Sequence, residues 1–508
     1  MLNARLKVNR GRSAMAEVME LYQSADKLRP ISITERQKAT RELYDRLAIE
    51  RDRWLARNRF FYNNDRRYIQ FLVPPGQRVL ELGCGEGQLL RSLQPSHGVG
   101  VDLSQEMINL ARERAPEFEF HVGNAEDPGL LDGIVGPFDY IILSDMVGYL
   151  EDCSNTFEAL QKLCTPKTRL VIAYYSHLWE PIVRFGERIG AKMPSMIQNW
   201  LSIDDTANLL RLAGFEVVRR EWRQLVPKRL LGIGVVLNKV VAPLPGIRRL
   251  CLRNYVVARP VRLRETATRN PSCTILIPCR NERGNIENAV RRLPQFSGDL
   301  EILFVEGHSS DGTYEECLRV KDSYPHRKIR TFKQPGKGKG DAVRLGFANA
   351  QGEIVMILDA DLTVPPESMP KFYRALVEGY GEFVNGTRLV YPMSDRAMRT
   401  LNAIANRAFA MLFSYLLNQR LTDTLCGTKA LWKKDYERIA AARSYFGEFD
   451  PFGDFDLIFG AAKLNLKIVE VPVRYADRAY GETQISRFRD GWLLLRMVAL
   501  AWRKLKAL

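Results

Sequence analysis

Two stretches of the chain alternate between short apolar runs and amphipathic segments. In the first stretch, strands are expected at residues 78–83, 97–104, 118–125, 138–144 and 168–176, and helices at residues 87–93 and 105–115. Buried runs of this length, separated by helical segments, are typical of βαβ units. The pattern therefore predicts a doubly wound, mainly parallel sheet in this half of the chain.

The same alternation restarts at Cys273. Strands are expected within residues 273–282, 299–309 and 353–361, and helices at residues 284–293 and 338–350. The last of these strands is the most apolar and ends in two acidic residues, Asp359 and Asp361. We therefore expect an α/β protein with two doubly wound domains.

Changes in composition mark the expected boundaries. Residues 15–70 are strongly charged and helical in pattern, residues 216–260 are basic and apolar with several prolines, and the polar segment that follows reads as a linker. The expected division is a basic helical extension over 1–70, a domain over 71–260, a linker over 261–272, a domain over 273–485 and a basic amphipathic helix over 486–508.

Composition and charge narrow the class of protein. The chain has 508 residues, of which 46% are hydrophobic and 26% charged, so two domains with sizeable cores are expected. A formal net charge of +16 attracts polyanions such as nucleic acid, anionic lipid or phosphorylated substrates. Because no zinc-finger or RNP-type motif accompanies the charge, we expect no nucleic-acid partner.

The cysteines and the apolar stretches indicate the compartment. The eight cysteines are scattered without a CxxC pair, which predicts reduced thiols rather than a zinc site or a disulfide framework. The start of the chain lacks the apolar core of a signal peptide, and no uninterrupted apolar stretch is long enough to span a bilayer. We expect a cytoplasmic protein that associates with the cytoplasmic face of a membrane.

A glycine-rich turn ends the first strand of the first domain, with the sequence Glu81-Leu82-Gly83-Cys84-Gly85-Glu86-Gly87. Glycines at this GxGxG spacing let the chain turn tightly and let a ligand approach the backbone. Gln88 stands where a dinucleotide fingerprint needs its last glycine, which argues against NAD. Asp102 ends the second strand, where a carboxylate can accept hydrogen bonds from ribose hydroxyls.

These residues resemble the class I S-adenosylmethionine-dependent methyltransferases, over about residues 76–215. The resemblance implies a Rossmann-like domain with S-adenosyl-L-methionine as its cofactor. The residues that it places around the cofactor are Glu81, Gly83, Gly85 and Gly87 at the methionine end, Asp102 at the ribose, and Asn124, Ala125 and Glu126 at the adenine. The family usually has Asp where this chain has Asn124.

The methyl acceptor is not identified by the sequence. Methyl transfer depends mainly on holding a nucleophile in line with the sulfonium, so no fixed catalytic residue is diagnostic. The candidates to meet an acceptor are Ser144, Asp145, Tyr149, His177 and Trp179, with His177 interpreted as a loop or packing residue rather than a base. The alternative is a domain that binds the cofactor, or acts as a scaffold, without turnover.

The second domain carries four features in chain order. They are Pro278-Cys279-Arg280-Asn281-Glu282, Glu306-Gly307-His308-Ser309-Ser310-Asp311-Gly312-Thr313, Lys337-Gly338-Lys339-Gly340 and Asp359-Ala360-Asp361. The paired carboxylates at the end of a buried parallel strand are hard ligands suited to Mg²⁺ or Mn²⁺. An ion there can bridge the two phosphates of a nucleotide diphosphate and neutralise charge on the leaving group.

Together the four features resemble family 2 glycosyltransferases with the GT-A fold, over about residues 273–490. The residues that the resemblance places around the nucleotide sugar are Pro278, Arg280, Glu282, Glu306, Asp311, Lys339 and Asp359. It places the metal ion on Asp359 and Asp361. Gly307 stands where the family often has a second successive Asp.

Later motifs resemble the polyprenyl-phosphate (dolichyl-phosphate) mannosyl- and glucosyltransferases. They are Gly386-Thr387-Arg388 and residues 423–429, 471–475 and 480–486. In those enzymes the acceptor is a lipid phosphate, which needs cations to position it rather than a strong base. The available arginines are Arg388, Arg396, Arg399 and Arg474.

A glycan hydroxyl is the alternative acceptor, and it requires a general base. Asp454 is the candidate for that base, although an acid at the start of a helix is an equal interpretation. The residues expected to take part in catalysis are thus Asp361, Arg388, Arg474 and Asp454.

Two segments combine apolar residues with basic ones, at residues 402–417 and 488–508, and residues 230–250 are a weaker third. Basic amphipathic helices with tryptophans bind anionic membrane interfaces. The alternatives for the first two are packing on the protein's own core or a dimer seam. The sequence as a whole predicts metal-dependent sugar transfer from a nucleotide-diphosphate sugar to a polyprenyl-phosphate-type lipid, fused to an S-adenosylmethionine-dependent methyltransferase domain.

Overall fold

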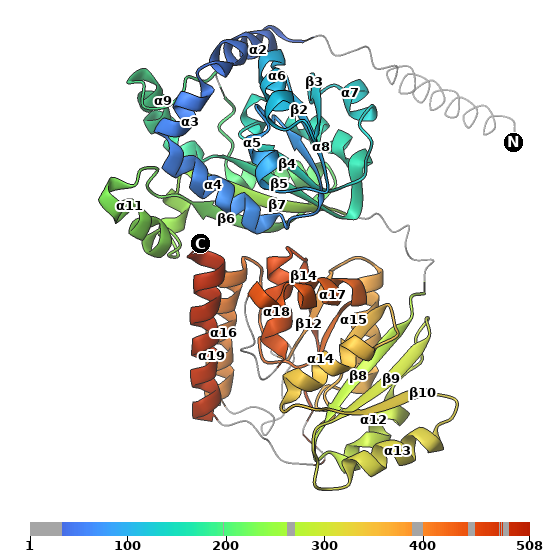
Figure 1. Ribbon diagram of the computed structural model, residues 1–508. Coiled ribbons are helices and arrows are strands. Elements are labelled where there is room, and N and C mark those ends of the chain that lie inside the picture. The colour runs from blue at the N-terminus through green and yellow to red at the C-terminus, as the bar shows by residue number, and fades with distance from the viewer. Residues whose placement is uncertain are drawn as a thin grey trace, which may run out of the picture.

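Two α/β units follow one another along the chain, the first in blue to green and the second in yellow to red (Figure 1). The computed structural model describes residues 33–196, 198–261, 270–388, 400–445, 453–476, 478, 480 and 487–507. Within these ranges, no helix is both long and apolar enough to cross a bilayer.

The first unit is a seven-stranded sheet with helices on both faces. Its elements are α2 (Glu35–Ala48), α3 (Arg51–Arg57), α4 (Arg59–Leu72), β1 (Arg78–Leu82), α5 (Gln88–Ser92), β2 (His97–Asp102), α6 (Gln105–Arg114), β3 (Glu119–Val122), α7 (Pro128–Asp132), β4 (Phe138–Ser144), α8 (Cys153–Leu160), β5 (Cys164–Tyr175), α9 (Glu180–Arg188), α10 (Ile203–Leu212), β6 (Phe215–Arg223), α11 (Ile233–Val236) and β7 (Arg253–Pro260). The strand order is β3-β2-β1-β4-β5-β7-β6, in which only β7 runs antiparallel to its neighbours.

The parallel part of this sheet, β1 to β5, forms where the hydrophobic pattern predicted it. The pattern did not reveal β6 and β7, because their apolar positions alternate with arginines and the prolines between them obscure the spacing. Among those arginines, Arg219, Arg253 and Arg259 are buried by partners elsewhere in the fold. Arg253 of β7 is fully buried and its Nε lies 2.9 Å from an Asp65 carboxylate oxygen in α4.

The helices before β1 belong to the body of this unit. Thr34 caps α2 in a capping box with Gln37, and α4 buries Ile69 and Leu72 completely against the sheet. The described part of the predicted extension is therefore helical, but it packs as an integral layer. Residues 1–32 lie outside the described ranges.

The second unit is also a seven-stranded sheet. Its elements are β8 (Cys273–Cys279), α12 (Ile286–Arg292), β9 (Leu300–Glu306), α13 (Thr313–Ser323), β10 (Lys328–Lys333), α14 (Lys339–Asn349), β11 (Ile354–Ile357), α15 (Met369–Val377), β12 (Phe383–Thr387), α16 (Thr400–Leu417), β13 (Lys429–Trp432), α17 (Lys433–Ala441), α18 (Asp454–Lys463), β14 (Ile468–Pro472) and α19 (Arg487–Ala501). The order is β10-β9-β8-β11-β13-β12-β14, with β10, β9, β8 and β11 parallel and β13 antiparallel to both neighbours. The loops after β8, β9 and β11 consequently meet at one edge.

The helices α16 and α19 lie side by side along this unit (Figure 1). Their facing sides bury Phe413 and Leu416 from α16, and Leu494 and Met497 from α19. Packing on the protein's own core, the alternative to membrane contact, is therefore confirmed for one side of each helix. The other side exposes three large apolar side chains to solvent, Met411, Trp492 and Leu495.

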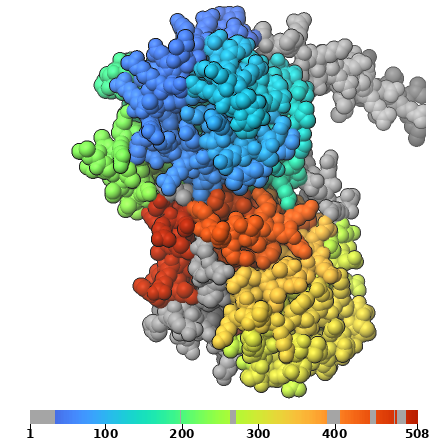
Figure 2. Space-filling model, viewed as in Figure 1, coloured from blue at the N-terminus to red at the C-terminus, as the bar shows by residue number. Residues whose placement is uncertain are grey.

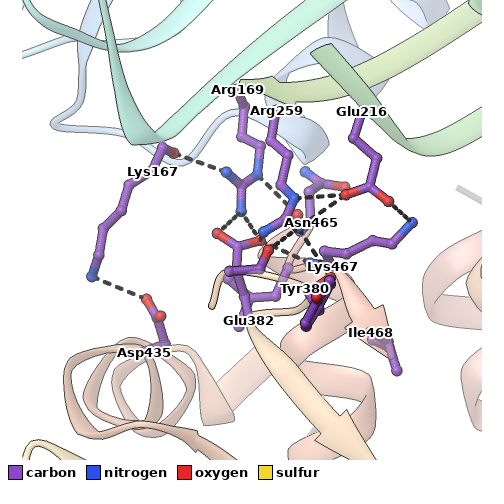
Figure 3. Close-up of polar contacts among 12 residues, drawn as sticks. Lys167, Arg169, Glu216, Arg259, Tyr380, Glu382, Asp435, Asn465, Lys467 and Ile468 are labelled. Atoms are coloured by element: carbon purple, nitrogen blue, oxygen red, sulfur yellow. Dashed lines mark hydrogen bonds and ion pairs between the residues drawn. The ribbon is translucent and has the colours of Figure 1, made fainter. Parts of the chain in front are cut away.

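Buried charges join the two units (Figure 3). Arg169 of β5 donates from Nη2 to both carboxylate oxygens of Glu382, at 2.8 and 2.6 Å, and the same carboxylate lies 3.7 Å from Arg259 of β7. The backbone N–H of Lys467 also donates to it, at 2.8 Å. Glu382 is only 8% exposed, so a buried carboxylate of the second unit contacts two guanidinium groups of the first.

Further contacts extend this interface. Lys506 lies 3.0 Å from Glu221 of β6, and Lys463 of α18 donates to the carbonyl of Phe71 in α4. The rings of Phe71 and Tyr445 are 6.1 Å apart. Figure 2 shows the two units in direct contact along this boundary. Because the shared groups are buried on both sides, the units are fixed relative to one another.

Candidate active sites

A cavity of about 190 Å³ opens at the carboxyl ends of β1, β2 and β4 in the first unit. The residues expected at a cofactor or acceptor that line it are Gly83, Gly85, Asp102, Asn124, Ala125, Glu126, Ser144, Asp145 and Tyr149. The strand order reverses at β1, which lies between β2 and β4. Doubly wound sheets bind ligands at the carboxyl ends of the strands at such a point.

Asp102 lines the cavity and also fixes the glycine turn. Its Oδ2 accepts a hydrogen bond from the Gly85 N–H at 2.8 Å, and its Oδ1 accepts one from the Ser104 N–H at 2.9 Å. Burial raises the pKa of this carboxyl above its ordinary value, against the effect of those hydrogen bonds. The carboxylate therefore holds the turn in the shape that exposes Gly83 and Gly85 to the cavity.

Asn124 fits an adenine-binding role. Its Oδ1 accepts from the Glu126 N–H at 3.0 Å, whereas its Nδ2 is buried without a hydrogen-bond partner among the described residues. A buried donor left unpaired costs free energy that a ligand's acceptor can recover. The chemistry of the wall thus suits a purine ring nitrogen at this position.

Glu81 and Gly87, also expected at the cofactor, are not among the residues lining the cavity. Gly87 begins α5 with φ +73°, and a Cβ there would lie 2.9 Å from the Phe120 ring. A turn and a close approach of the helix therefore require glycine at this position. Glu81 is 2% exposed at the end of β1, and burial raises its pKa to about 8.

The Glu81→Gln variant is expected to change how stability depends on pH. The folded chain holds a proton on Glu81 that the unfolded chain releases, so wild-type stability falls as pH rises from the ordinary carboxyl pKa to about 8. The slope from this group reaches about 1.4 kcal/mol per pH unit. Urea unfolding across that pH range should show that the free energy of unfolding of the variant increases relative to that of wild type as pH rises. The exposed Glu113→Gln is the matched control, and parallel profiles for Glu81→Gln and wild type would contradict the assignment.

Residues from α2, α3 and α4 cover the cavity, a role that no sequence motif indicates. Gln37 donates to Glu126 at 2.7 Å, and the Tyr44 and Tyr149 hydroxyls lie 2.8 Å apart. The Arg51 guanidinium lies over the glycine turn, with Nη2 3.1 Å from where a Gly85 Cβ would stand. A cation at that point is suited to the carboxylate of the methionine end.

Of the candidates to meet an acceptor, Ser144, Asp145 and Tyr149 line the cavity, but His177 and Trp179 do not. His177 is exposed and begins a short 3-10 helix, His177–Trp179. The Trp179 indole N–H donates to the Leu250 carbonyl at 2.7 Å, outside the cavity. The structure therefore places neither side chain at the cavity.

The second candidate site lies at the edge of the second sheet where β8, β9 and β11 end. The residues that the topology brings there are Pro278, Arg280 and Glu282 after β8, Glu306 and Asp311 after β9, Lys339 at the start of α14, and Asp359 and Asp361 after β11. Parallel strands bring these distant segments together because their carboxyl ends share one edge.

Both carboxylates after β11 are paired with cations. Lys339 Nζ lies 2.7 Å from Asp359, and Arg478 Nη2 lies 2.6 Å from Asp361, whose other oxygen accepts from the N–H and hydroxyl of Thr363. Two hard oxygen donors on one turn fit Mg²⁺ or Mn²⁺, which proteins commonly hold with one or two carboxylates plus phosphate oxygens. An ion bound by these two carboxylates would have to displace Lys339 from Asp359 and Arg478 from Asp361.

Lys339 joins the strand ends to α18. It lies 3.9 Å from Asp454, which also lies 3.4 Å from the fully buried Lys429. Burial opposes its charge, but Asp359 and Asp454 outweigh that effect and raise the pKa of Lys339. A Cβ at Gly427 would stand 2.1 Å from Asp359, so backbone without a side chain must lie against this pair.

The acids after β8 and β9 shape the neighbouring loops. Glu282 lies 3.6 Å from Arg478, which thus bridges to Asp361, and burial raises the pKa of Glu282 to about 7. Asp311 accepts from the backbone N–H groups of Arg283 and Thr313 at 3.2 and 3.1 Å. Arg478 was missed because it falls between the two motifs at residues 471–475 and 480–486.

The arginines expected to position an acceptor phosphate differ in their surroundings. Arg388 forms a two-pronged pair with the buried Asp423, with its Nε and Nη2 at 2.6 and 2.8 Å from the carboxylate oxygens. Those two donors are engaged within the protein. Arg474 is exposed. Arg396 and Arg399, like residues 481–486, lie outside the described residues.

Two family models match the chain. One, described as Glycosyl transferase family 2, matches residues 274–439, and one, described as Methyltransferase domain, matches residues 50–220. A dolichol-phosphate mannosyltransferase of Pyrococcus furiosus is 30% identical over 218 residues, which are 42% of this chain and 59% of that relative. The chain thus spans less than two thirds of the relative's length.

Two solved structures are also similar to parts of the chain. A glucosyl-3-phosphoglycerate synthase of Mycobacterium tuberculosis is 18% identical with a TM-score of 0.34, covering 46% of this chain and 80% of its own. An S-adenosylmethionine-dependent methyltransferase of Thermotoga maritima is 18% identical with a TM-score of 0.34, covering 43% of this chain and 99% of its own. On the family models, the chain carries a methyltransferase domain followed by a family 2 glycosyltransferase domain.

Proposed function

We propose that the second domain transfers a sugar from a nucleotide-diphosphate sugar to a polyprenyl-phosphate-type lipid, with a divalent metal ion on Asp359 and Asp361. The observation that carries this proposal is the arrangement of the paired carboxylates beside Lys339 and Arg478 at the edge where β8, β9 and β11 end. When bound, the ion supplies positive charge to the departing diphosphate.

The cations of the site then have a defined task. Lys339 and Arg478 are paired with the carboxylates and become able to contact phosphate oxygens once the carboxylates bind an ion instead. Asp454 is held between Lys339 and Lys429, which favours a structural role for it over that of a general base. This arrangement supports an acceptor that is already ionised.

The lipid-phosphate acceptor is supported by the motif at residues 423–429 and by the mannosyltransferase relative. The test supplies purified protein with Mg²⁺, membranes containing polyprenyl phosphates, and a panel of labelled nucleotide sugars. A labelled lipid that is stable to alkali but released by mild acid identifies a sugar on a lipid phosphate. Label that appears only in glycan, with none in lipid, contradicts the proposal.

For the first domain we propose S-adenosyl-L-methionine as the ligand of the cavity. Gly83, Gly85 and Asp102 line it as the resemblance requires, and the unpaired Asn124 Nδ2 and the Arg51 guanidinium match the two ends of such a molecule. Methyl transfer to an acceptor beside Asp145 and Tyr149 follows if that ligand binds.

The Asn124→Ala variant is expected to weaken S-adenosylmethionine binding by about tenfold, since one hydrogen bond to a buried donor is lost. Isothermal titration of the full chain measures this. Asn155→Ala is the matched control, because Asn155 lies in α8 outside the cavity. If wild type and Asn124→Ala bind S-adenosylmethionine with equal affinity, the adenine does not contact Asn124. If wild type does not bind it at all, the result favours a scaffolding role for the domain.

A further inference from the structure

The first unit exposes two groups of large apolar side chains that lie outside its core clusters. One group lies in and around α9, and the other lies in the segment between β6 and β7. We call the two groups together the apolar ridge. Its residues are Leu178, Ile182, Phe185, Ile189, Leu230, Leu231, Ile233, Val236, Val240, Leu244 and Leu250. Exposed apolar groups of this size mark interaction surfaces. In Figures 1 and 2, α9 and α11 protrude on the same side of the molecule.

The two parts of the apolar ridge are connected through the protein. Val183, on the buried side of α9, packs in one cluster with Phe61 and Leu252. The Trp179 indole donates to the Leu250 carbonyl at 2.7 Å. The exposed side chains of α9 and of the 230–250 segment therefore lie on elements that share contacts on their inner sides.

The tip of the apolar ridge is held in a defined shape. Leu230 and Leu231 have φ angles of +45° and +54°, a backbone conformation that costs free energy for residues other than glycine. Asn238 closes the segment by accepting from the Val226 N–H at 2.9 Å and donating to the Val226 carbonyl at 2.8 Å. The result presents Leu231 fully to solvent, at 105% of its reference exposure.

The charges around the apolar ridge have one dominant sign. Between Leu225 and Leu252 the sequence contains no Asp or Glu, and it carries Lys228, Arg229, Lys239, Arg248 and Arg249. On α9, Arg184 and Arg188 are exposed, while Glu180 and Glu187 are half-buried and pair with Arg184 and Lys192. Apolar side chains framed by cations complement an interface of acyl chains and anionic headgroups.

We propose that the apolar ridge inserts into the interface of a membrane containing anionic lipids, and thereby anchors the methyltransferase domain at the surface. In Figure 1 this ridge faces the same side as α16 and α19, which expose Met411, Trp492 and Leu495. The inference deepens the proposed function, since a lipid-phosphate acceptor resides in such a membrane, and it assigns the contact to the first unit as well as to the second.

The test is sedimentation of the full chain with vesicles of phosphatidylcholine alone or mixed with phosphatidylglycerol, without nucleotide sugar or polyprenyl phosphate. Wild type is expected to bind the mixed vesicles more tightly than the neutral ones. Replacing Leu231 and Ile233 together by serine is expected to weaken that binding about tenfold or more, because two side chains no longer leave water. The Leu212→Ser variant is the matched control, since Leu212 is 65% exposed outside the ridge.

The charge requirement has its own variant. Replacing Arg229 and Arg249 by glutamate is expected to abolish the preference for phosphatidylglycerol. The proposal is overturned if the serine variant binds the mixed vesicles as wild type does, or if wild type binds neither vesicle. A wild-type dimer that the serine substitutions convert to a monomer, with no vesicle binding, would instead assign the ridge to a second copy of the chain.

Failure of this proposal and failure of the proposed sugar transfer are distinguishable. The vesicles contain no substrate, so binding is scored without catalysis. Transfer to an acceptor dispersed in detergent is expected to persist in the serine variant, because the ridge lies in the other unit from Asp359 and Asp361.

Discussion

Replacing Asp361 with alanine is expected to reduce sugar transfer by about 10³-fold, the magnitude typical of losing a group that stabilises the charge on a leaving group. Asp361 shares the turn after β11 with Asp359, and removing it leaves a single carboxylate for a divalent ion. The fold is expected to tolerate the change, because Arg478 retains Glu282 at 3.6 Å. Initial rates with saturating metal and nucleotide sugar measure the effect.

Metal removal is the companion experiment. Chelation is expected to stop transfer by wild type, and added Mg²⁺ or Mn²⁺ is expected to restore it, whereas neither ion restores Asp361→Ala. The exposed Asp322→Ala, on α13, is the matched acid outside the site and is expected to keep the wild-type rate. Full activity of chelated wild type, or of Asp361→Ala, would refute the role given to these carboxylates.

Replacing Glu382 with alanine is expected to lower the free energy of unfolding by about 3–5 kcal/mol, because it leaves the buried Arg169 guanidinium without its carboxylate partner. Arg169 and Arg259 both face this carboxylate, and Arg169 is 2% exposed. Since the Arg169–Glu382 ion pair bridges the two units, losing it should also make their unfolding less cooperative. Urea unfolding is expected to separate into two transitions.

Glu216→Ala is the control for the same interface. Glu216 contacts Arg259 at 2.9 Å and Lys467 at 2.5 Å, but its side chain is one-third exposed, so its removal is expected to cost about 1 kcal/mol or less. A double change of Arg169 to Met and Glu382 to Leu is expected to recover much of the lost stability. A single wild-type-like transition for Glu382→Ala would show that the ion pair does not hold the units together.

The parts of the fold that the sequence predicted are those governed by local pattern. The strands β1, β2, β4, β5, β8, β9 and β11 contain apolar runs that are buried on both faces, and that pattern is visible without knowledge of the rest of the chain. The strands β6 and β7 were missed because their buried arginines depend on partners distant in sequence. Arg253 needs Asp65 and Asp145, which lie 188 and 108 residues away.

The candidate sites show the same division. Gly83, Gly85, Asp102 and Asn124 line the first cavity as expected, since they end strands whose order fixes their position. Tyr44 and Arg51, which cover this cavity, were not predicted. They lie in charged helices before the first strand, and nothing in the sequence of those helices indicates a contact with the site. Arg478 also had no motif of its own, although it contacts Asp361 directly.

The interface around Glu382 has a consequence for traffic between the two sites. Because buried ion pairs fix one unit on the other, no hinge rotation can bring the cavity after β1 and the paired carboxylates after β11 face to face without breaking those pairs. A compact metabolite handled by both would have to dissociate and diffuse through solvent. A long lipid-linked molecule could instead remain tethered by its tail while its head group visits each in turn.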